Sequence, residues 1–281
     1  MRPFTLFSPP KTPFQILSDL HLNHASQYLT FHIPVSAPYL ILAGNIGRLI
    51  DYDSYLSFLI RRCNLHEKVY LVPGALEFHG LSWMDGLQLA HRMEKEPQTR
   101  GRLEVLYETR ADVPGTKVSL LGATLWSRIA EGDAAAVVKR GGEFDAATGM
   151  REWGVERHNS EHRRDLRWLL EEVRGLVGAG RRVVVVTAFA PDLQNCLEPW
   201  QVDAPWAAAC GTDLLGGMGW KGVDVWVCGT TGRTCEVRVN GVRVVSNQRG
   251  REDESVTGML RDGLSEKQKV GVFDVMRVVR V

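Results

Sequence analysis

The chain has 281 residues, of which 44% are hydrophobic and 24% charged, as in an ordinary globular protein with a core. Its 34 basic and 33 acidic side chains leave a net charge of +1, so it lacks the basic excess expected of a nucleic-acid-binding or membrane-surface protein. No apolar run approaches the roughly 20 residues of a membrane span, and residues 1–10 lack the apolar stretch of a signal peptide.

The first half of the chain alternates short apolar runs with helical patterns. The runs at 14–19, 39–44, 68–74, 103–107 and 118–126 are apolar almost throughout, which predicts strands covered on both faces. Helices are expected at 52–65 and 81–96. Residues 127–152 contain small residues and a Gly-Gly pair, and they predict a long surface loop.

The second half continues the alternation. Residues 158–177 have the strongest helical pattern, because aliphatic side chains fall on one face before Gly178. Strands are expected at 181–187, 223–229 and 270–281, and Asn240-Gly241 predicts a tight hairpin between 236–239 and 242–246. Residues 189–221 predict a second long loop. The order predicts a single α/β domain over 1–281, with function in the loops at the strand ends.

Five strand ends carry short motifs in a fixed order, at 18–21, 43–47, 72–78, 186–191 and 228–232. With the hairpin and the helix that begins at 158, they resemble the calcineurin-like metallophosphoesterase family over nearly the whole chain. The resemblance implies a calcineurin-like phosphoesterase fold: two packed mixed β-sheets flanked by helices, a four-layer α-β-β-α sandwich with its cleft at the strand ends. In that family the cleft holds two metal ions, which stabilise the attacking and leaving oxygens.

Most of the family's ligand positions are altered here. Asp19 and His21 match its D-x-H pair, whereas Asn45 stands where a carboxylate bridges the two metals. The remaining ligand positions hold Ala75, Leu76, Ala188, Thr230 and Gly232. No histidine follows residue 162, so none is available to replace the missing C-terminal ligands. We therefore expect no metal, no cofactor, and no phosphoester hydrolysis by the family's mechanism.

The replacements are apolar or uncharged, which predicts a largely apolar cavity with a few polar groups, typical of a site for an organic ligand. We expect Asp19, His21 and Glu77 to be catalytic, through an imidazole oriented by a carboxylate and a carboxyl group of raised pKa. The expected ligand-binding residues are Asn45, Leu76, His79, Phe189, Thr230 and Arg233. The predicted function is a metal-independent enzyme or binder that acts on an apolar small molecule by isomerisation, cyclisation or elimination.

Two other interpretations stay open. In one, the chain is a non-catalytic scaffold, and Asp19 and His21 only form hydrogen bonds that close the strand ends. In the other, a single weak metal at these two residues supports residual phosphoester hydrolysis. His158 and His162 share a helix face, but we expect exposed positions for both. The five cysteines form no C-x-x-C pair, so buried thiols in a cytoplasmic protein are expected. The oligomeric state is left open.

Overall fold

The structure is a computed structural model that describes residues 11–250 and 271–281, and its strands form two mixed sheets. The first sheet has the order β11-β1-β2-β3-β4, from Val278–Arg280, Pro13–Leu17, Tyr39–Ala43, Lys68–Val72 and Leu103–Val105. The second has the order β5-β6-β7-β8-β10-β9, from Thr109–Asp112, Val118–Ala123, Arg182–Thr187, Val223–Cys228, Val242–Ser246 and Cys235–Val239. Within each sheet, only the pairings of the edge strands β11, β5 and β9 are antiparallel.

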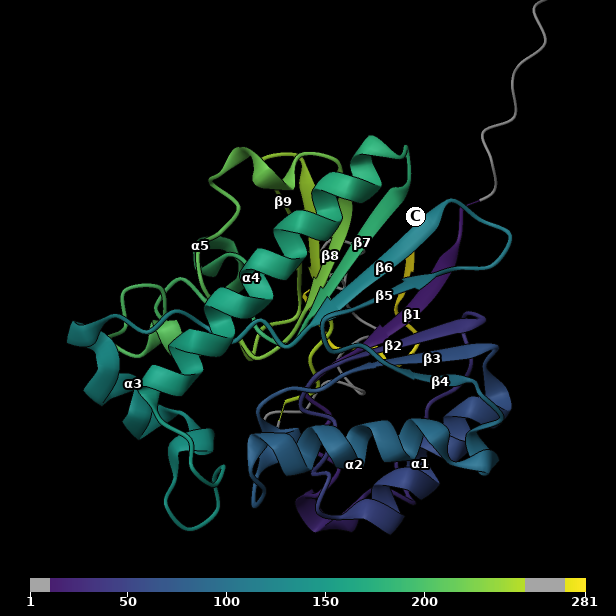
Figure 1. Cartoon of the computed structure of the whole chain (residues 1–281), viewed down its shortest axis with the longest axis horizontal. Coiled ribbons are helices and arrows are strands. Elements are labelled where there is room, and N and C mark those ends of the chain that lie inside the picture. Colours follow the sequence, from purple (N-terminus) through teal and green to yellow (C-terminus); the bar gives the residue numbers. More distant parts are fainter. Residues whose placement is uncertain (1–10, 251–270) are drawn as a thin grey trace, which may run out of the picture.

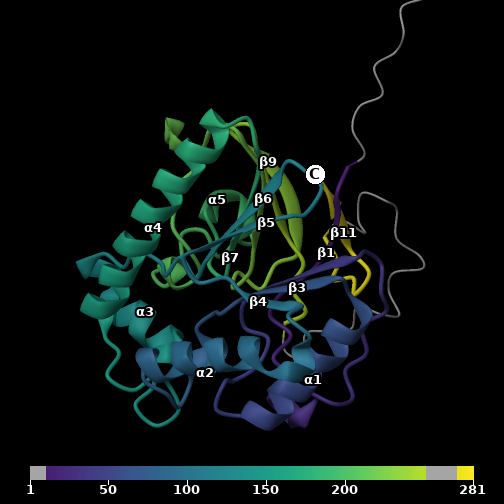
Figure 2. The same cartoon turned by 45° about the vertical axis from the view of Figure 1, so that its right-hand side comes forward.

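Helices cover the outer face of each sheet. α1 (Tyr52–Leu65) and α2 (Trp83–Lys95) lie along the first sheet, and the long α4 (Val155–Gly178) lies along the second (Figures 1 and 2). The two sheets pack face to face between them, which gives four layers in the order helix, sheet, sheet, helix. The predicted α/β fold with two packed, mixed sheets is confirmed.

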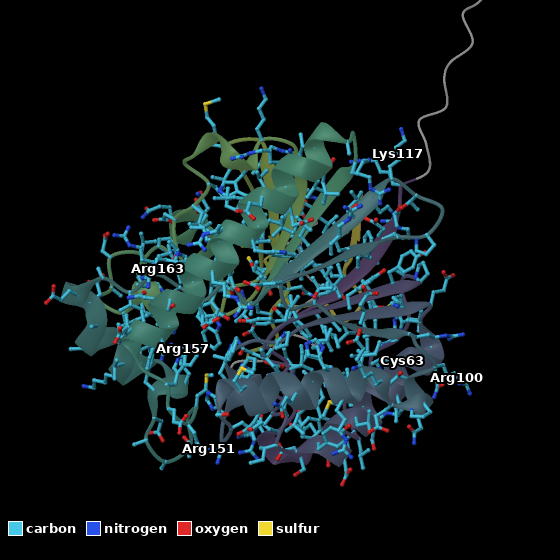
Figure 3. All side chains as sticks on the ribbon, in the orientation of Figure 1. Cys63, Arg100, Lys117, Arg151, Arg157 and Arg163 are labelled. Atoms are coloured by element: carbon cyan, nitrogen blue, oxygen red, sulfur yellow. The ribbon has the colours of Figure 1, made fainter. Side chains whose placement is uncertain are left out.

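The continuous apolar character of the strands follows from this layering. On β2, Ile41 and Ala43 belong to the core between the sheets, whereas Leu40 and Leu42 belong to the core under α1 and α2. Successive side chains of a strand point to opposite faces, so a strand covered on both sides is apolar at every position. Side chains fill the space between the layers (Figure 3).

Several predicted boundaries agree with the structure, and others do not. The helix at 52–65 is confirmed, as is the hairpin, where Asn240 and Gly241 both have positive φ (47° and 91°). The predicted loop at 127–152 contains the helix α3 (Ala134–Arg140), and the loop at 189–221 contains the short α5 (Leu193–Cys196).

Other predictions concern the chain ends, the membrane and the cysteines. The predictions for residues 1–10 and for residue 270 lie outside the described residues. Of the strand predicted over 270–281, residues 278–280 form β11, whereas residues 271–277 form turns and irregular structure, so the predicted strand is too long. None of the helices in the described ranges is long and apolar enough to cross a bilayer. All five cysteines are buried and free, as predicted.

Candidate functional site

The carboxyl ends of five strands meet at one edge of the two sheets. β1, β2 and β3 are mutually parallel, as are β7 and β8, so the loops that follow them emerge on the same side. These loops carry Asp19, Asn45, Leu76, Phe189 and Thr230 in turn. Ligand sites of open α/β sheets commonly lie at such strand ends, and the motifs identified in the sequence converge here.

A cavity of about 280 Å³ lies at this edge. Pockets for drug-sized ligands span about 300–1,000 Å³, so this cavity suits a small molecule. Predicted site residues among its lining are Asp19, His21, Asn45, Leu76, His79, Phe189 and Thr230. Further lining residues are Ala75, Arg140, Gly141, Gly142, Glu143, Ala209, Cys210, Gly232, Gln248 and Gly250. Eight of these side chains are polar or charged (residues 19, 21, 45, 79, 140, 143, 230 and 248), so the cavity is more polar than the sequence predicts.

A closed set of hydrogen bonds forms the floor of the cavity. The Asn45 amide donates from Nδ2 to Asp19 Oδ1 at 2.9 Å and to Thr230 Oγ1 at 3.0 Å, and its Oδ1 accepts from the Leu76 N–H at 3.0 Å. The Thr230 N–H donates to Asp19 Oδ2 at 3.1 Å, and its hydroxyl donates to the Ala188 carbonyl at 2.8 Å. Burial raises the pKa of Asp19 to about 6, although these donors oppose the rise.

The loops that carry this network adopt uncommon backbone conformations. Asp19, His21, Asn45 and Thr230 all have positive φ, at 52°, 48°, 55° and 68°. Asp and Asn tolerate this region, but a β-branched residue such as threonine is a true outlier there. Gly44 (φ 82°) is needed because a Cβ atom would lie 2.5 Å from Cβ of Ala188. Strained residues that cluster at one edge are typical of a functional site.

The side chains of this edge do not fit the two-metal centre that the resemblance implies. A bridging ligand must turn a lone pair to each cation, whereas Asn45 turns an N–H towards Asp19 and its single oxygen is engaged by Leu76. Nowhere in the described ranges do three or more His, Cys, Asp or Glu side chains form a group that could hold a metal ion. Asn45 therefore takes part in a hydrogen-bond network at the position where the family has a carboxylate that binds both metal ions.

Glu77 lies behind the cavity wall. The sequence predicts that this residue faces the cavity, but its side chain is 0% exposed and is absent from the lining. Its carboxylate accepts from the backbone N–H groups of Ile46, Asn45 and Gly74 at 2.7, 2.9 and 2.8 Å, and from the Tyr55 hydroxyl at 3.0 Å. Burial raises the pKa of Glu77 to about 7 against these donors. Glu77 thus joins the loops after β2 and β3.

Arg233 is also placed away from the cavity. Its guanidinium donates to the carbonyls of Asn195 and Leu197 at 3.1 and 2.7 Å, and it lies 3.5 Å from the Glu198 carboxylate. These contacts tie the loop after β8 to the end of α5. The predicted ligand contact of Arg233 is therefore replaced by a structural one.

One wall of the cavity comes from the segment that the sequence predicts to be a surface loop. The guanidinium carbon of Arg140, at the end of α3, lies 4.8 Å from the centroid of the Trp206 ring. Glu143, in the segment after α3, is only 5% exposed. The His79 imidazole lies against this segment, since a Cβ atom on Gly142 would be 3.0 Å from its Cε1. Burial lowers the pKa of His79 to about 4, so the imidazole is neutral at pH 7. The helix-forming run that ends at Arg140 is a signal for α3, but no local pattern marks Glu143.

His158 and His162 are buried, and the prediction of exposed positions is wrong. Their side chains are 0% and 3% exposed. Both continue the buried face of α4 through Asp165 to Leu169 and Val173, at spacings of four, three, four and four residues. A helix places such residues on one side, so the apolar periodicity of the C-terminal half of α4 extends to these histidines.

The layers and the strand ends define a calcineurin-like metallophosphoesterase fold. A phosphopantetheinyl hydrolase from Mycobacterium tuberculosis is similar over 98% of this chain and 97% of its own, with a TM-score of 0.64 and 16% identity. A dimetal phosphatase from Danio rerio is similar over 85% of this chain and 88% of its own, with a TM-score of 0.45 and 13% identity. No protein-family model and no curated protein sequence matches the chain.

Proposed function

We propose that the chain binds a small organic molecule in this cavity without a metal ion and catalyses its conversion by proton transfer. The observation that carries the proposal is the Asn45 amide, which donates to Asp19 and Thr230 in the place of a metal-bridging carboxylate. The apolar surfaces of Leu76 and Phe189 accommodate the body of the molecule, and the polar side chains orient it. Isomerisation, cyclisation and elimination are the reaction classes that such a site serves.

The proton-transfer roles fall to side chains that line the cavity. His79 is neutral near pH 7, so its imidazole orients the molecule as a hydrogen-bond partner. Asp19 and His21 remain the candidates from the D-x-H motif, with Asp19 fixed in one orientation by the donors of Asn45 and Thr230. Glu77 has no part in this proposal, because its oxygens are engaged behind the cavity wall.

A non-catalytic scaffold is the second candidate. It is favoured by the same network, because each polar atom of the Asn45 side chain is engaged within the protein. Metal-dependent phosphoester hydrolysis, the third candidate, receives less support from these side chains. The metal-independent enzyme and the non-catalytic scaffold differ in whether small molecules enter the cavity.

A cavity-filling substitution tests the proposal. Leu76 is half-buried and lines the cavity, so Leu76→Trp is expected to block it. We expect small neutral fragments to raise the melting temperature of EDTA-treated wild-type protein by roughly 5 °C at about 100 times the dissociation constant. The shift is expected to disappear in Leu76→Trp and to persist in Leu65→Trp, at a position that is 53% exposed.

Three outcomes oppose this proposal. Fragment shifts that survive Leu76→Trp place binding elsewhere. Turnover of p-nitrophenyl phosphate that requires added Mn²⁺ favours the hydrolase. The absence of any fragment shift favours the scaffold.

A further inference from the structure

The segment after α3 holds a buried carboxyl group at the wall of the cavity. Glu143 is 5% exposed and is one of the residues that line the cavity. Its backbone is held in place, because its carbonyl accepts from the Met150 N–H at 2.9 Å. A Cβ atom on Gly141 would lie 2.8 Å from Glu143 Oε2, so the carboxyl group lies directly against a glycine that lines the same cavity.

The Glu143 carboxyl group has no partner on another residue within the part of the chain that the structure describes. The one N–H that donates to it is that of its own backbone. His158 Nδ1 lies 4.0 Å from Oε1, which is too far for a hydrogen bond, and no lysine or arginine of residues 11–250 and 271–281 lies within 4.0 Å. A buried carboxyl group is unfavourable without partners, so its presence here indicates that a partner from outside the chain completes it.

The charges around the cavity indicate the chemistry of this partner. The described part of the lining holds two carboxyl groups, those of Asp19 and Glu143, and one guanidinium, that of Arg140. The Arg140 side chain is exposed and lies within 4.0 Å of neither carboxyl group. Asp19 accepts from the uncharged donors of Asn45 and Thr230. Neither carboxyl group is therefore neutralised by a lysine or an arginine of the described residues.

Aromatic rings lie beside the carboxyl group. Phe144, the next residue in the chain, stacks on His158 with 5.4 Å between ring centroids, and His158 lies 5.9 Å from Phe189, which lines the cavity. The faces of aromatic rings attract cations and disfavour anions. Such rings also keep water away, which strengthens the attraction between a carboxylate and a cation. The cavity thus suits a positively charged group that is attached to an apolar body.

We propose that the molecule bound in this cavity is an organic amine and that its protonated nitrogen donates to the Glu143 carboxylate. The inference rests on the proposed function and names the chemical class of its ligand. An ammonium group supplies the missing donors, and its charge offsets that of the buried carboxylate. An anionic molecule is repelled by the two carboxyl groups, and a neutral molecule leaves their charge unpaired. The apolar part of the amine lies against Leu76 and Phe189.

Three compounds with the same ring test the inference: benzylamine, benzyl alcohol and benzoate, which are positive, neutral and negative. Calorimetric titration of the EDTA-treated full chain at pH 8 measures their dissociation constants. This pH lies above the pKa values of about 7 and about 6 to which burial raises Glu143 and Asp19. We expect benzylamine to bind about tenfold more tightly than benzyl alcohol, and benzoate not to bind. Leu76→Trp is expected to abolish the binding of benzylamine.

Glu143→Gln keeps the shape of the side chain and removes its charge. We expect it to weaken the binding of benzylamine about tenfold and to change that of benzyl alcohol by less than about twofold. Glu131→Gln is the matched control, because Glu131 is exposed just before α3 and does not line the cavity, and it is expected to leave both dissociation constants unchanged. The comparison of the three compounds on the wild-type chain needs no variant, so it decides the question even if Glu143→Gln does not fold.

Equal or weaker binding of benzylamine than of benzyl alcohol by the wild-type chain would overturn the inference. Unchanged binding of benzylamine by folded Glu143→Gln would do the same. Neither result contradicts the proposed function while neutral compounds still bind in the cavity. Binding that survives Leu76→Trp, or no binding of any of these compounds and of the neutral fragments, would overturn the inference together with the proposed function.

Discussion

Glu77→Ala is expected to lower the free energy of unfolding by roughly 3–5 kcal/mol. Four donors within 3.0 Å converge on this fully buried carboxylate, three of them backbone N–H groups in the loops after β2 and β3. Alanine leaves these donors without an acceptor and opens a cavity beneath the network. Urea denaturation at pH 7.5 measures the change, and the loss is large because every partner is buried.

Glu171→Ala is the control, since Glu171 is exposed on α4 and is expected to change stability by less than about 0.5 kcal/mol. Glu77→Gln keeps the shape but sets an NH₂ group against N–H donors, so we expect an intermediate loss. A loss below about 1 kcal/mol for Glu77→Ala would contradict the structural role assigned here and return Glu77 to the catalytic candidates.

Asn45→Asp is expected to destabilise the chain by about 3 kcal/mol at pH 8 and by much less at pH 5. Aspartate tolerates the positive φ of Asn45, so the change tests charge rather than backbone strain. It removes the donor to Asp19 and Thr230 and places two carboxylates about 2.9 Å apart. Urea denaturation across this pH range measures the effect.

The direction of this pH dependence follows from Asp19, because burial raises the pKa of Asp19 to about 6 in the wild type. Below that value one carboxyl of the variant's pair is protonated and donates to the other, and above it both are charged and repel. Asn64→Asp, at an exposed position on α1, is expected to change stability by less than about 1 kcal/mol. Stabilisation of Asn45→Asp by Mn²⁺ would contradict the account, because it would mean that one carboxylate is enough to rebuild a metal site.

The layered fold is predictable because burial on two faces leaves a strong mark in sequence. β2 and β3 are apolar at nearly every position, and α1 alternates buried and exposed residues with the period of a helix. β5 is missed because it is an edge strand in which only Ala111 is buried, while Arg110 and Asp112 pair at its surface. Its sequence has the pattern of a polar loop.

The site is predictable only as far as the strand-end motifs reach. They place Asp19, Asn45, Leu76 and Thr230 around the cavity, because parallel strands end at the same edge. Whether a side chain near a motif points into the cavity depends on the loop backbone, and this is why Glu77 is misplaced. Glu143 belongs to a segment that is distant from the motifs in sequence and lies beside them only in the folded structure, so the sequence does not predict its place in the cavity.

Metal binding by the wild-type chain tests the central claim most directly. The protein is treated with EDTA, dialysed and titrated with Mn²⁺ by calorimetry at pH 7.5, after elemental analysis of the protein as purified. Because Asn45 offers an N–H to Asp19 rather than a lone pair to a cation, we predict substoichiometric metal and no saturable heat. About two equivalents of tightly bound metal per chain, as expected of a two-metal centre, would contradict the account.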